Sequence, residues 1–218
     1  MTAIGPAILF SEMRPDPAWE ERFNHWYDSD HIPVRMAIDG FTGTQRYRAV
    51  DDDNYLVIYD MDSLDVLKSP AYNVVKTEPS AETKWMLANV SNFTRFLGTE
   101  IAREGKIDAE TITAQLIFVA QFNVPEDMQP EFDQWMAEDH VPTLLKGEHW
   151  LGTRRFAMTV GEPVPYNRLA IHYLAGEAAL QSAERAEARA SAWRARLTEH
   201  DWFNQGHAKA FRRHGERF

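Results

Sequence analysis

Imidazole and phenol side chains are the first candidates for chemistry in this sequence. Unperturbed imidazole titrates close to neutral pH, so a histidine can take up or return a proton as a general base or acid. A tyrosine hydroxyl can also donate or accept. We predict catalytic roles in proton transfer for four side chains: His31, Tyr59, His140 and His172. The alternative for His31 and His140 is structural, namely a hydrogen bond from a helix end to a backbone carbonyl.

A second group of side chains is predicted to bind substrate: Arg46, His149, Trp150 and Arg155. Arginine makes planar, bidentate contacts to anions, so Arg46 or Arg155 could hold a carboxylate, a phenolate or an enolate. The alternative for both arginines is a salt bridge with a nearby acid such as Glu12. His149 and Trp150 are adjacent and are predicted at the mouth of a cavity.

Metal ions and bound cofactors are not expected. The chain has no cysteine, which excludes disulfides, thiol nucleophiles and thiolate metal sites. His25 and His31 are spaced so that they do not share a helix face, and neighbouring ligand-type residues at 138–140 point apart. The sequence also contains no glycine-rich nucleotide loop, no dinucleotide fingerprint and no nucleophile elbow around a serine.

The chain is an internal tandem repeat. The pattern Phe23-x-x-Trp26-x-x-x-Asp30-His31-Ile32-Pro33 recurs, shifted by 109 positions, as Phe132-x-x-Trp135-x-x-x-Asp139-His140-Val141-Pro142. Farther along the shift becomes 113, which places Asn54-x-Leu56-x-Ile58 over Asn167-x-Leu169-x-Ile171. Self-similarity at a fixed shift over this length indicates two fused copies of one unit. We predict a first repeat at 1–98, a linker at 99–110 and a second repeat at 111–218.

Each copy predicts the element order βαββαβ, which is ferredoxin-like. In the first copy we expect strands near 7–13, 43–50, 55–61 and 92–97, a first helix from Asp16, and a second helix at 69–88. In the second copy the strands are expected near 116–122, 152–160, 168–174 and 208–212, with the second helix at 177–197. Pro33 and Pro142 should end the first helices, which places His31 and His140 near helix C-termini.

Strand alternation predicts which side chains meet. Leu56, Ile58 and Tyr47, with their counterparts, are expected to pack against the helices. Tyr59 and His172, together with Arg46 and Arg155, should then lie on the opposite, semi-polar face. Tandem duplication could bring two such faces together around a cavity. The charged stretch 184–196 is interpreted as a solvated helix face.

The pattern W-Y-D-x-D-H-I-P-x-R-x-x-x-x-G-F-x-G-T-x-R-Y, from Trp26 to Tyr47, resembles the signature of the EthD-like branch of the dimeric α+β barrel superfamily. The second copy resembles a diverged version. The resemblance implies an α+β fold in which two ferredoxin-like βαββαβ repeats form an intramolecular dimeric α+β barrel. It also implies that the helix-end histidine carries over to His31 and His140. The superfamily includes cofactor-free monooxygenases, polyketide cyclases, lactone isomerases, haem enzymes and proteins of unknown role, so the resemblance does not select one activity.

The leading hypothesis is a cofactor-independent enzyme of the isomerase, cyclase or lyase type, acting by proton transfer on a small aromatic or polyketide-like molecule in the barrel cavity. The alternatives are a non-catalytic binding or stress-related barrel, a haem-dependent enzyme and a cofactor-free oxygenase. The net charge of −10 disfavours nucleic-acid binding, because phosphate backbones attract basic surfaces. No signal peptide or membrane span is expected, which favours a cytoplasmic protein with a small-molecule substrate. A homodimer of the fused chain stays open.

Overall fold

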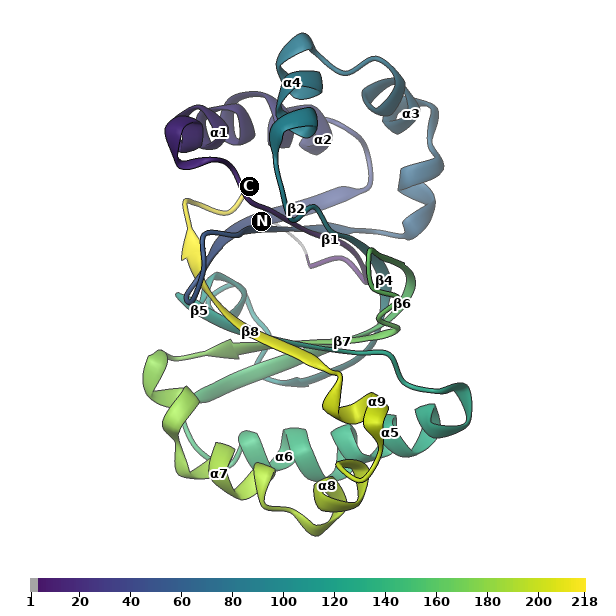
Figure 1. The fold of residues 1–218 in the computed structure, drawn as a ribbon, viewed down its shortest axis with the longest axis vertical. Coiled ribbons are helices and arrows are strands. Elements are labelled where there is room, and N and C mark those ends of the chain that lie inside the picture. The colour runs from purple at the N-terminus through teal and green to yellow at the C-terminus, as the bar shows by residue number, and fades with distance from the viewer. Residues whose placement is uncertain (1–3) are drawn as a thin grey trace. The chain divides into compact units, whose positions relative to one another are not determined.

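The computed structural model describes residues 4–218 and contains the two predicted copies of one element order (Figure 1). The first copy runs through β1 (Ala7–Met13), α1 (Glu20–Trp26), α2 (Ile32–Met36), β2 (Phe41–Ala49), β3 (Tyr55–Met61), α3 (Pro70–Thr77), α4 (Ala81–Asn89) and β4 (Arg95–Gly105). The second runs through β5 (Leu116–Phe122), α5 (Gln129–Trp135), α6 (Val141–Leu144), β6 (Trp150–Glu162), β7 (Arg168–Leu174), α7 (Ala183–Arg189), α8 (Ala192–Leu197), α9 (Asp201–Asn204) and β8 (His207–His214).

Strand pairing repeats with the shifts found in the sequence. In the first copy β4 pairs with β1, β1 with β3 and β3 with β2, all antiparallel. In the second, β8 pairs with β5, β5 with β7 and β7 with β6. Leu9 faces Tyr59 across the first ladder, and Phe118 faces His172 across the second. The complete strand order is β1-β3-β2-β8-β5-β7-β6-β4 in a closed barrel, which confirms the predicted α+β fold class.

The compact units exchange short segments of chain. One unit comprises the residues up to Thr99 together with 159–163 and 214–218; the other comprises 100–158 and 164–213. In the first unit the backbone of Phe218 exchanges two hydrogen bonds with Thr44, and Arg217 pairs with the buried Asp60 at 2.6 Å. The predicted linker at 99–110 is partly a strand, because β4 continues to Gly105.

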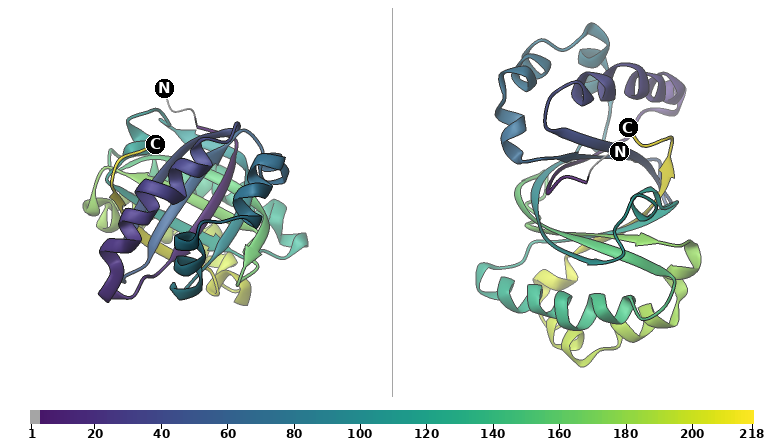
Figure 2. Two further views of the ribbon diagram at one scale, coloured as in Figure 1. Left: turned by 90° about the horizontal axis from the view of Figure 1, so that it is seen from above. Right: turned by 180° about the vertical axis from the view of Figure 1, so that it is seen from behind.

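Helices cover one face of the sheet in each unit (Figures 1 and 2). In the first unit Phe23 and Trp26 of α1 pack in one cluster with Tyr55, Val57 and Tyr59 of β3. The prediction that Leu56 and Ile58 face the helices was wrong. Every residue of β3 is buried and both faces carry large apolar side chains, so alternation does not distinguish the side that meets the helices.

The first helix of each copy does not end before its proline. A π-helical turn at Tyr27–His31 is followed directly by α2, and the same turn at Met136–His140 is followed by α6. The widened turn is closed by the N–H of Ile32 on the carbonyl of Tyr27, and by Val141 on Met136. Pro33 and Pro142 then occupy the first turn of the next helix, where the missing N–H is not needed. Turns of this kind are frequent at functional sites.

The predicted second helices are each interrupted. The first breaks between α3 and α4, where Pro79 disfavours a helical conformation at Glu78 and Ser80 caps the new helix. The second consists of α7 and α8, and Ser191 caps α8 by accepting a hydrogen bond from the N–H of Arg194. Within residues 4–218, no helix has both the length and the apolar character required to cross a lipid bilayer.

Candidate functional site

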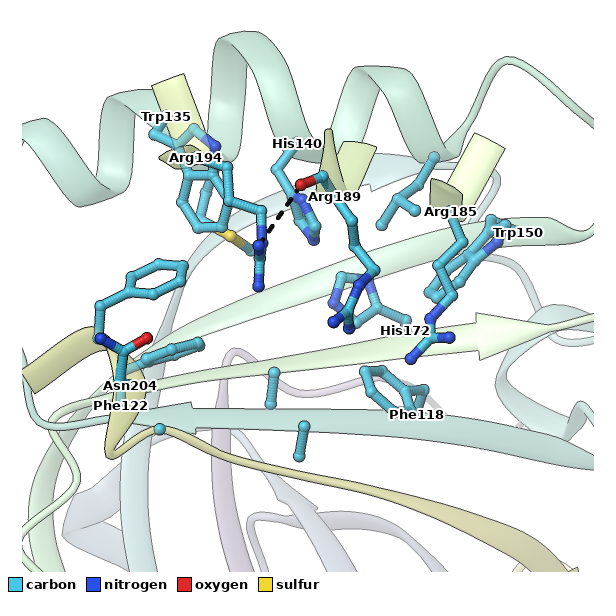
Figure 3. Close-up of a pocket in the computed structure, with 16 residues that line it drawn as sticks. Phe118, Phe122, Trp135, His140, Trp150, His172, Arg185, Arg189, Arg194 and Asn204 are labelled. Carbon is cyan, nitrogen blue, oxygen red and sulfur yellow. Dashed lines mark hydrogen bonds between the residues drawn. The ribbon is translucent and has the colours of Figure 1, made fainter. Parts of the chain in front are cut away.

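A pocket of about 250 Å³ lies in the second unit, between the helices and the sheet face formed by β5 and β7 (Figure 3). Aromatic rings form much of its wall, among them Phe118, Trp135 and Trp150. Its polar members are imidazoles, guanidinium groups and the amide of Asn204. The volume lies just below the range of about 300–1,000 Å³ typical of sites for drug-sized ligands. The pocket therefore suits a small aromatic molecule.

His140 enters this pocket from the last position of the π-helical turn. Its ring centroid lies 4.6 Å from the ring of Trp135, and its buried Nδ1 has no hydrogen-bond partner within the described residues. Burial and then Arg194 lower the pKa of His140 to about 4, against the opposing effect of Asp139. His140 is thus a neutral imidazole at neutral pH.

His172 enters the same pocket from β7, on the sheet side. Only 1% of its surface is exposed, and its Nδ1 lies 2.8 Å from Oγ1 of Thr153, the residue paired with it on β6. Its ring is 6.2 Å from that of His140 and 5.4 Å from that of Trp150. Burial, followed by His140 and Arg155, lowers the pKa of His172 to about 3. If Thr153 accepts from Nδ1–H, the Nε2 atom carries the free lone pair.

Two predicted residues of the second copy lie outside this pocket. Arg155 pairs with Glu104 at 2.6 Å and donates to the carbonyl of Asp133. His149 is partly exposed and does not line the pocket, although the adjacent Trp150 does. The structure therefore brings together His140, His172 and Trp150, and places the other two elsewhere.

The first unit has a smaller equivalent pocket of about 140 Å³, lined by His31 and Tyr59. Burial lowers the pKa of His31 and raises that of Tyr59, and the buried Tyr59 hydroxyl has no hydrogen-bond partner within the described residues. Arg46 is not part of this pocket. It forms a salt bridge with Asp28 at 2.8 Å and donates a hydrogen bond to Asn24. The sequence analysis gave a salt bridge as the alternative role for Arg46, but with Glu12 as the example of its partner.

Tyr59, His172, Arg46 and Arg155 all lie on the face of the sheet that meets the helices of their own unit. The sequence analysis placed them on the opposite face, and this was wrong. Most residues on both faces of these strands are buried, so alternation of burial does not mark the side that meets the helices. The observed position has a chemical consequence, because it brings Tyr59 and His172 into the pocket that holds the helix histidine of their own repeat. Pockets of this kind lie between helices and sheet within each unit.

Sequence reasoning missed three pocket residues: Arg185, Arg189 and Arg194. They belong to the stretch 184–196, which was interpreted as a solvated helix face. The 113-position shift contains a signal that could have located two of them, because it places Arg185 over Tyr72 and Arg189 over Lys76, and both of these line the first pocket. The break in the helix, which turns Arg194 inward, is not visible in that shift.

Within residues 4–218, no group of three or more His, Asp or Glu side chains is placed to hold a metal ion. The superfamily resemblance also implies haem enzymes. A cavity of about 250 Å³ leaves no room for a porphyrin beside its aromatic walls, so the residues of this pocket do not fit a haem.

No protein-family profile matches the chain, and no curated protein sequence matches it either. Solved structures are similar along nearly its whole length. An anthrone oxidase-like protein has a TM-score of 0.69 at 11% identity, covering 100% of this chain and 95% of that protein. A proposed monooxygenase from Fusobacterium nucleatum has a TM-score of 0.63 at 10% identity, covering 96% and 93%. A proposed chlorite dismutase has a TM-score of 0.56 at 12% identity, covering 96% and 95%.

Together with the strand order, this likeness decides the fold. The chain has the fold of the dimeric α+β barrel proteins. Identities of 10–12% show the fold alone, and they do not carry any neighbour's activity to this chain. Membership of the EthD-like branch stays a prediction. Within the dimeric α+β barrel fold, the function has to be argued from the pocket.

Proposed function

We propose that this protein is an enzyme that moves a proton on a small aromatic or polyketide-like molecule bound in the pocket of the second unit. One observation carries the proposal: His140 and His172 face the same aromatic-walled cavity with their rings 6.2 Å apart. Both imidazoles are neutral at neutral pH and can therefore act as bases. Reactions of this class include isomerisation, cyclisation and elimination.

The pair divides the work between two sides of the ligand. Either imidazole can remove a proton from carbon and then, as the imidazolium, return it at a different atom, which moves a double bond or closes a ring. Burial makes either imidazolium costly, but the enolate or carbanion formed in the same step is an anion that offsets this cost. The hydrogen bond of His172 to Thr153 fixes its ring orientation.

Solvent-deuterium exchange tests this proposal without knowledge of the natural substrate. Anthrone, a carbon acid suggested by the name of one similar structure, is incubated with the protein in D₂O, and deuterium uptake is measured by mass spectrometry. We expect exchange to exceed the uncatalysed rate, and to fall about 100-fold or more in His140→Gln or His172→Gln, as for loss of a general base. His25→Gln, on the exposed side of α1, is the matched control and should exchange normally.

Two outcomes separate the alternatives. Binding of anthrone without any accelerated exchange in the wild type would overturn the proposal and favour a non-catalytic binding protein. Uptake of one O₂ per anthrone, giving anthraquinone and water, would support the proton abstraction as the first step of a cofactor-free oxidation. This second candidate is favoured by the same histidine pair, because the carbanion it generates can react with oxygen.

A further inference from the structure

Three guanidinium groups reach into the pocket of the second unit from the helices above it (Figure 3). Arg185 and Arg189 lie one turn apart on α7, and Arg194 comes from α8. Figure 3 shows Arg185 and Arg189 extending toward the strands that carry His172 and Phe118. The cluster and the two histidines thus share one cavity.

No carboxylate neutralises this cluster within the described part of the chain. Two of its side chains donate hydrogen bonds to backbone carbonyls: Arg185 to Leu180 at 2.6 Å, and Arg194 to Arg189 at 3.4 Å. The other arginines that face the helices in this unit are paired with acids, Arg155 with Glu104 and Arg168 with Asp133. The unpaired cluster is therefore a local feature of the pocket.

Clustered like charges are unfavourable unless an anion joins them. Burial and the neighbouring Arg189 lower the pKa of Arg185, and burial with both other arginines lowers that of Arg194. An oxyanion with two or more terminal oxygens would relieve this repulsion and accept bidentate hydrogen bonds from the guanidinium planes.

The aromatic wall lies beside the cations. The Cζ atom of Arg185 is 5.6 Å from the ring centroid of Phe118, which in turn lies 6.2 Å from the ring of Trp150. A ligand that reaches the guanidinium groups with an anionic group would therefore place an attached ring against these side chains.

The first repeat provides an internal comparison. The 113-position shift places Arg185 over Tyr72 and Arg189 over Lys76. Thr83 follows its capping serine, Ser80, as Arg194 follows Ser191, and all three of these first-repeat residues line the first pocket. Only one of these three is a cation, and the remaining cations of that pocket, Arg35 and Arg95, come from other elements. The second pocket alone has three arginines at these helix positions.

We propose that the pocket of the second unit binds an aromatic anion, with its oxyanion held by Arg185, Arg189 and Arg194 and its ring against Phe118 and Trp150. This rests on the proposed function in one respect, since it names the substrate class of the same site. The shared chemistry is a carboxylate, phosphate ester or sulfate ester on an aromatic ring. Binding itself requires no proton transfer.

Calorimetric titration tests this assignment with three probes of one shape: 2-naphthoate, 2-naphthyl phosphate and the neutral 2-naphthamide. The decisive variant is Arg189→Gln, because this side chain is exposed and forms no hydrogen bond or ion pair with residues 4–218, so the fold should survive. Arg196→Gln removes the same charge from the exposed side of α8 and is the matched control.

At least one anionic probe should bind the wild type about tenfold more tightly than the amide, and Arg189→Gln should lose about tenfold or more while Arg196→Gln does not. The tighter anion identifies carboxylate or phosphate as the preferred group, and either supports the proposal. Equal affinity for the amide and both anions, or unchanged affinity in Arg189→Gln, overturns it.

Binding of the naphthyl probes and deuterium exchange are separate measurements on the wild type, and this keeps the two proposals apart. Anion selectivity in a wild type that binds anthrone without exchanging its protons would leave this inference standing and remove the proposed function. Exchange without anion selectivity would do the reverse.

Discussion

At the scale of single residues, His140 is controlled by the charges around it. Arg194, Arg185 and Arg189 lower the pKa of His140 after burial, whereas Asp139 raises it. An anion held by the arginines would cancel part of their effect. Ligand binding would then raise the pKa of His140 from about 4 toward neutrality and make it a stronger base at the moment when substrate is present.

Acid titration of stability checks the residue-scale picture. The pKa of His140 is about 4 in the folded state and about 6.5 when unfolded, so the unfolded chain binds more protons between these values. Stability should therefore fall as the pH falls from about 6.5 to about 4. The imidazole accounts for about 3 kcal/mol of this loss, at about 1.4 kcal/mol for each unit of pKa difference.

Urea unfolding of the wild type and His140→Gln across this range measures the effect. The variant should lose less stability on acidification, and the difference should level off below pH 4. His172 stays in both proteins, but His140 helps to lower its pKa, so the His172 shift is smaller in the variant and the variant should lose still less stability on acidification. Parallel curves for the two proteins would show that His140 is not held neutral.

The sequence located the helix histidines, Tyr59 and Trp150, because these residue types stand out at repeated positions. It did not locate the arginine cluster. Charged residues spaced along an alanine-rich helix usually face solvent, and only the tertiary fold shows that Arg185 and Arg189 point at a cavity. Arg46 and Arg155 were selected for their charge, but ion pairs occupy both side chains.

At the scale of elements, the sequence predicted the order βαββαβ twice, together with both strand hairpins. It did not predict the π-helical turns, since a one-residue widening leaves the apolar pattern of the helix nearly unchanged. The breaks between α3 and α4 and between α7 and α8 were also missed. Ser80 and Ser191 are the local signals, because serine prefers the N-cap of a helix.

The Ser191 cap connects an element boundary to the site. Its Oγ accepts from the N–H of Arg194 and donates to Asp139, the neighbour of His140, at 2.5 Å. Ser191→Ala should lower the free energy of unfolding by about 1 kcal/mol, which is typical for a lost cap. It should also weaken binding of an aromatic anion, because Arg194 loses the capped helix end that positions it.

Ser80→Ala is the matched control for this prediction. Ser80 caps α4 by accepting from Thr83 and donates to Asp30 at 2.8 Å, so the geometry is the same in the first unit. Its replacement should cost similar stability in thermal unfolding but leave calorimetric binding of the anionic probe unchanged. Equal losses of binding in both variants would indicate that stability, and not the position of Arg194, controls affinity.

At the scale of the whole molecule, the tandem repeat was readable because one shift carried many identities. The sequence did not predict that 159–163 and 214–218 belong to the first compact unit. Strand continuation through 99–105 and the return of 214–218 to the first unit are set by pairing partners far away in the chain. A repeat boundary in the sequence therefore need not be a boundary of stable structure.

A fragment of residues 1–98 tests whether the first repeat folds by itself. It contains α1–α4 and β1–β3 but lacks 159–163 and 214–218, which belong to the same compact unit. It loses the backbone pair of Phe218 with Thr44, the ion pair of Arg217 with Asp60 and the contact of Thr159 with the carbonyl of Leu97. Domains have only about 5–15 kcal/mol of net stability, so the loss of these three contacts removes a large share of it.

We expect the fragment to show no cooperative thermal transition by circular dichroism under conditions in which the full chain melts cooperatively. A chain ending at Arg213 is the control, because it lacks only the returning segment 214–218. It should melt at a lower temperature than the wild type while its second repeat stays folded. If the fragment unfolds cooperatively at the wild-type midpoint, the segments 159–163 and 214–218 contribute little to the stability of the first repeat. The predicted domain at 1–98 would then be a unit of folding as well as of sequence.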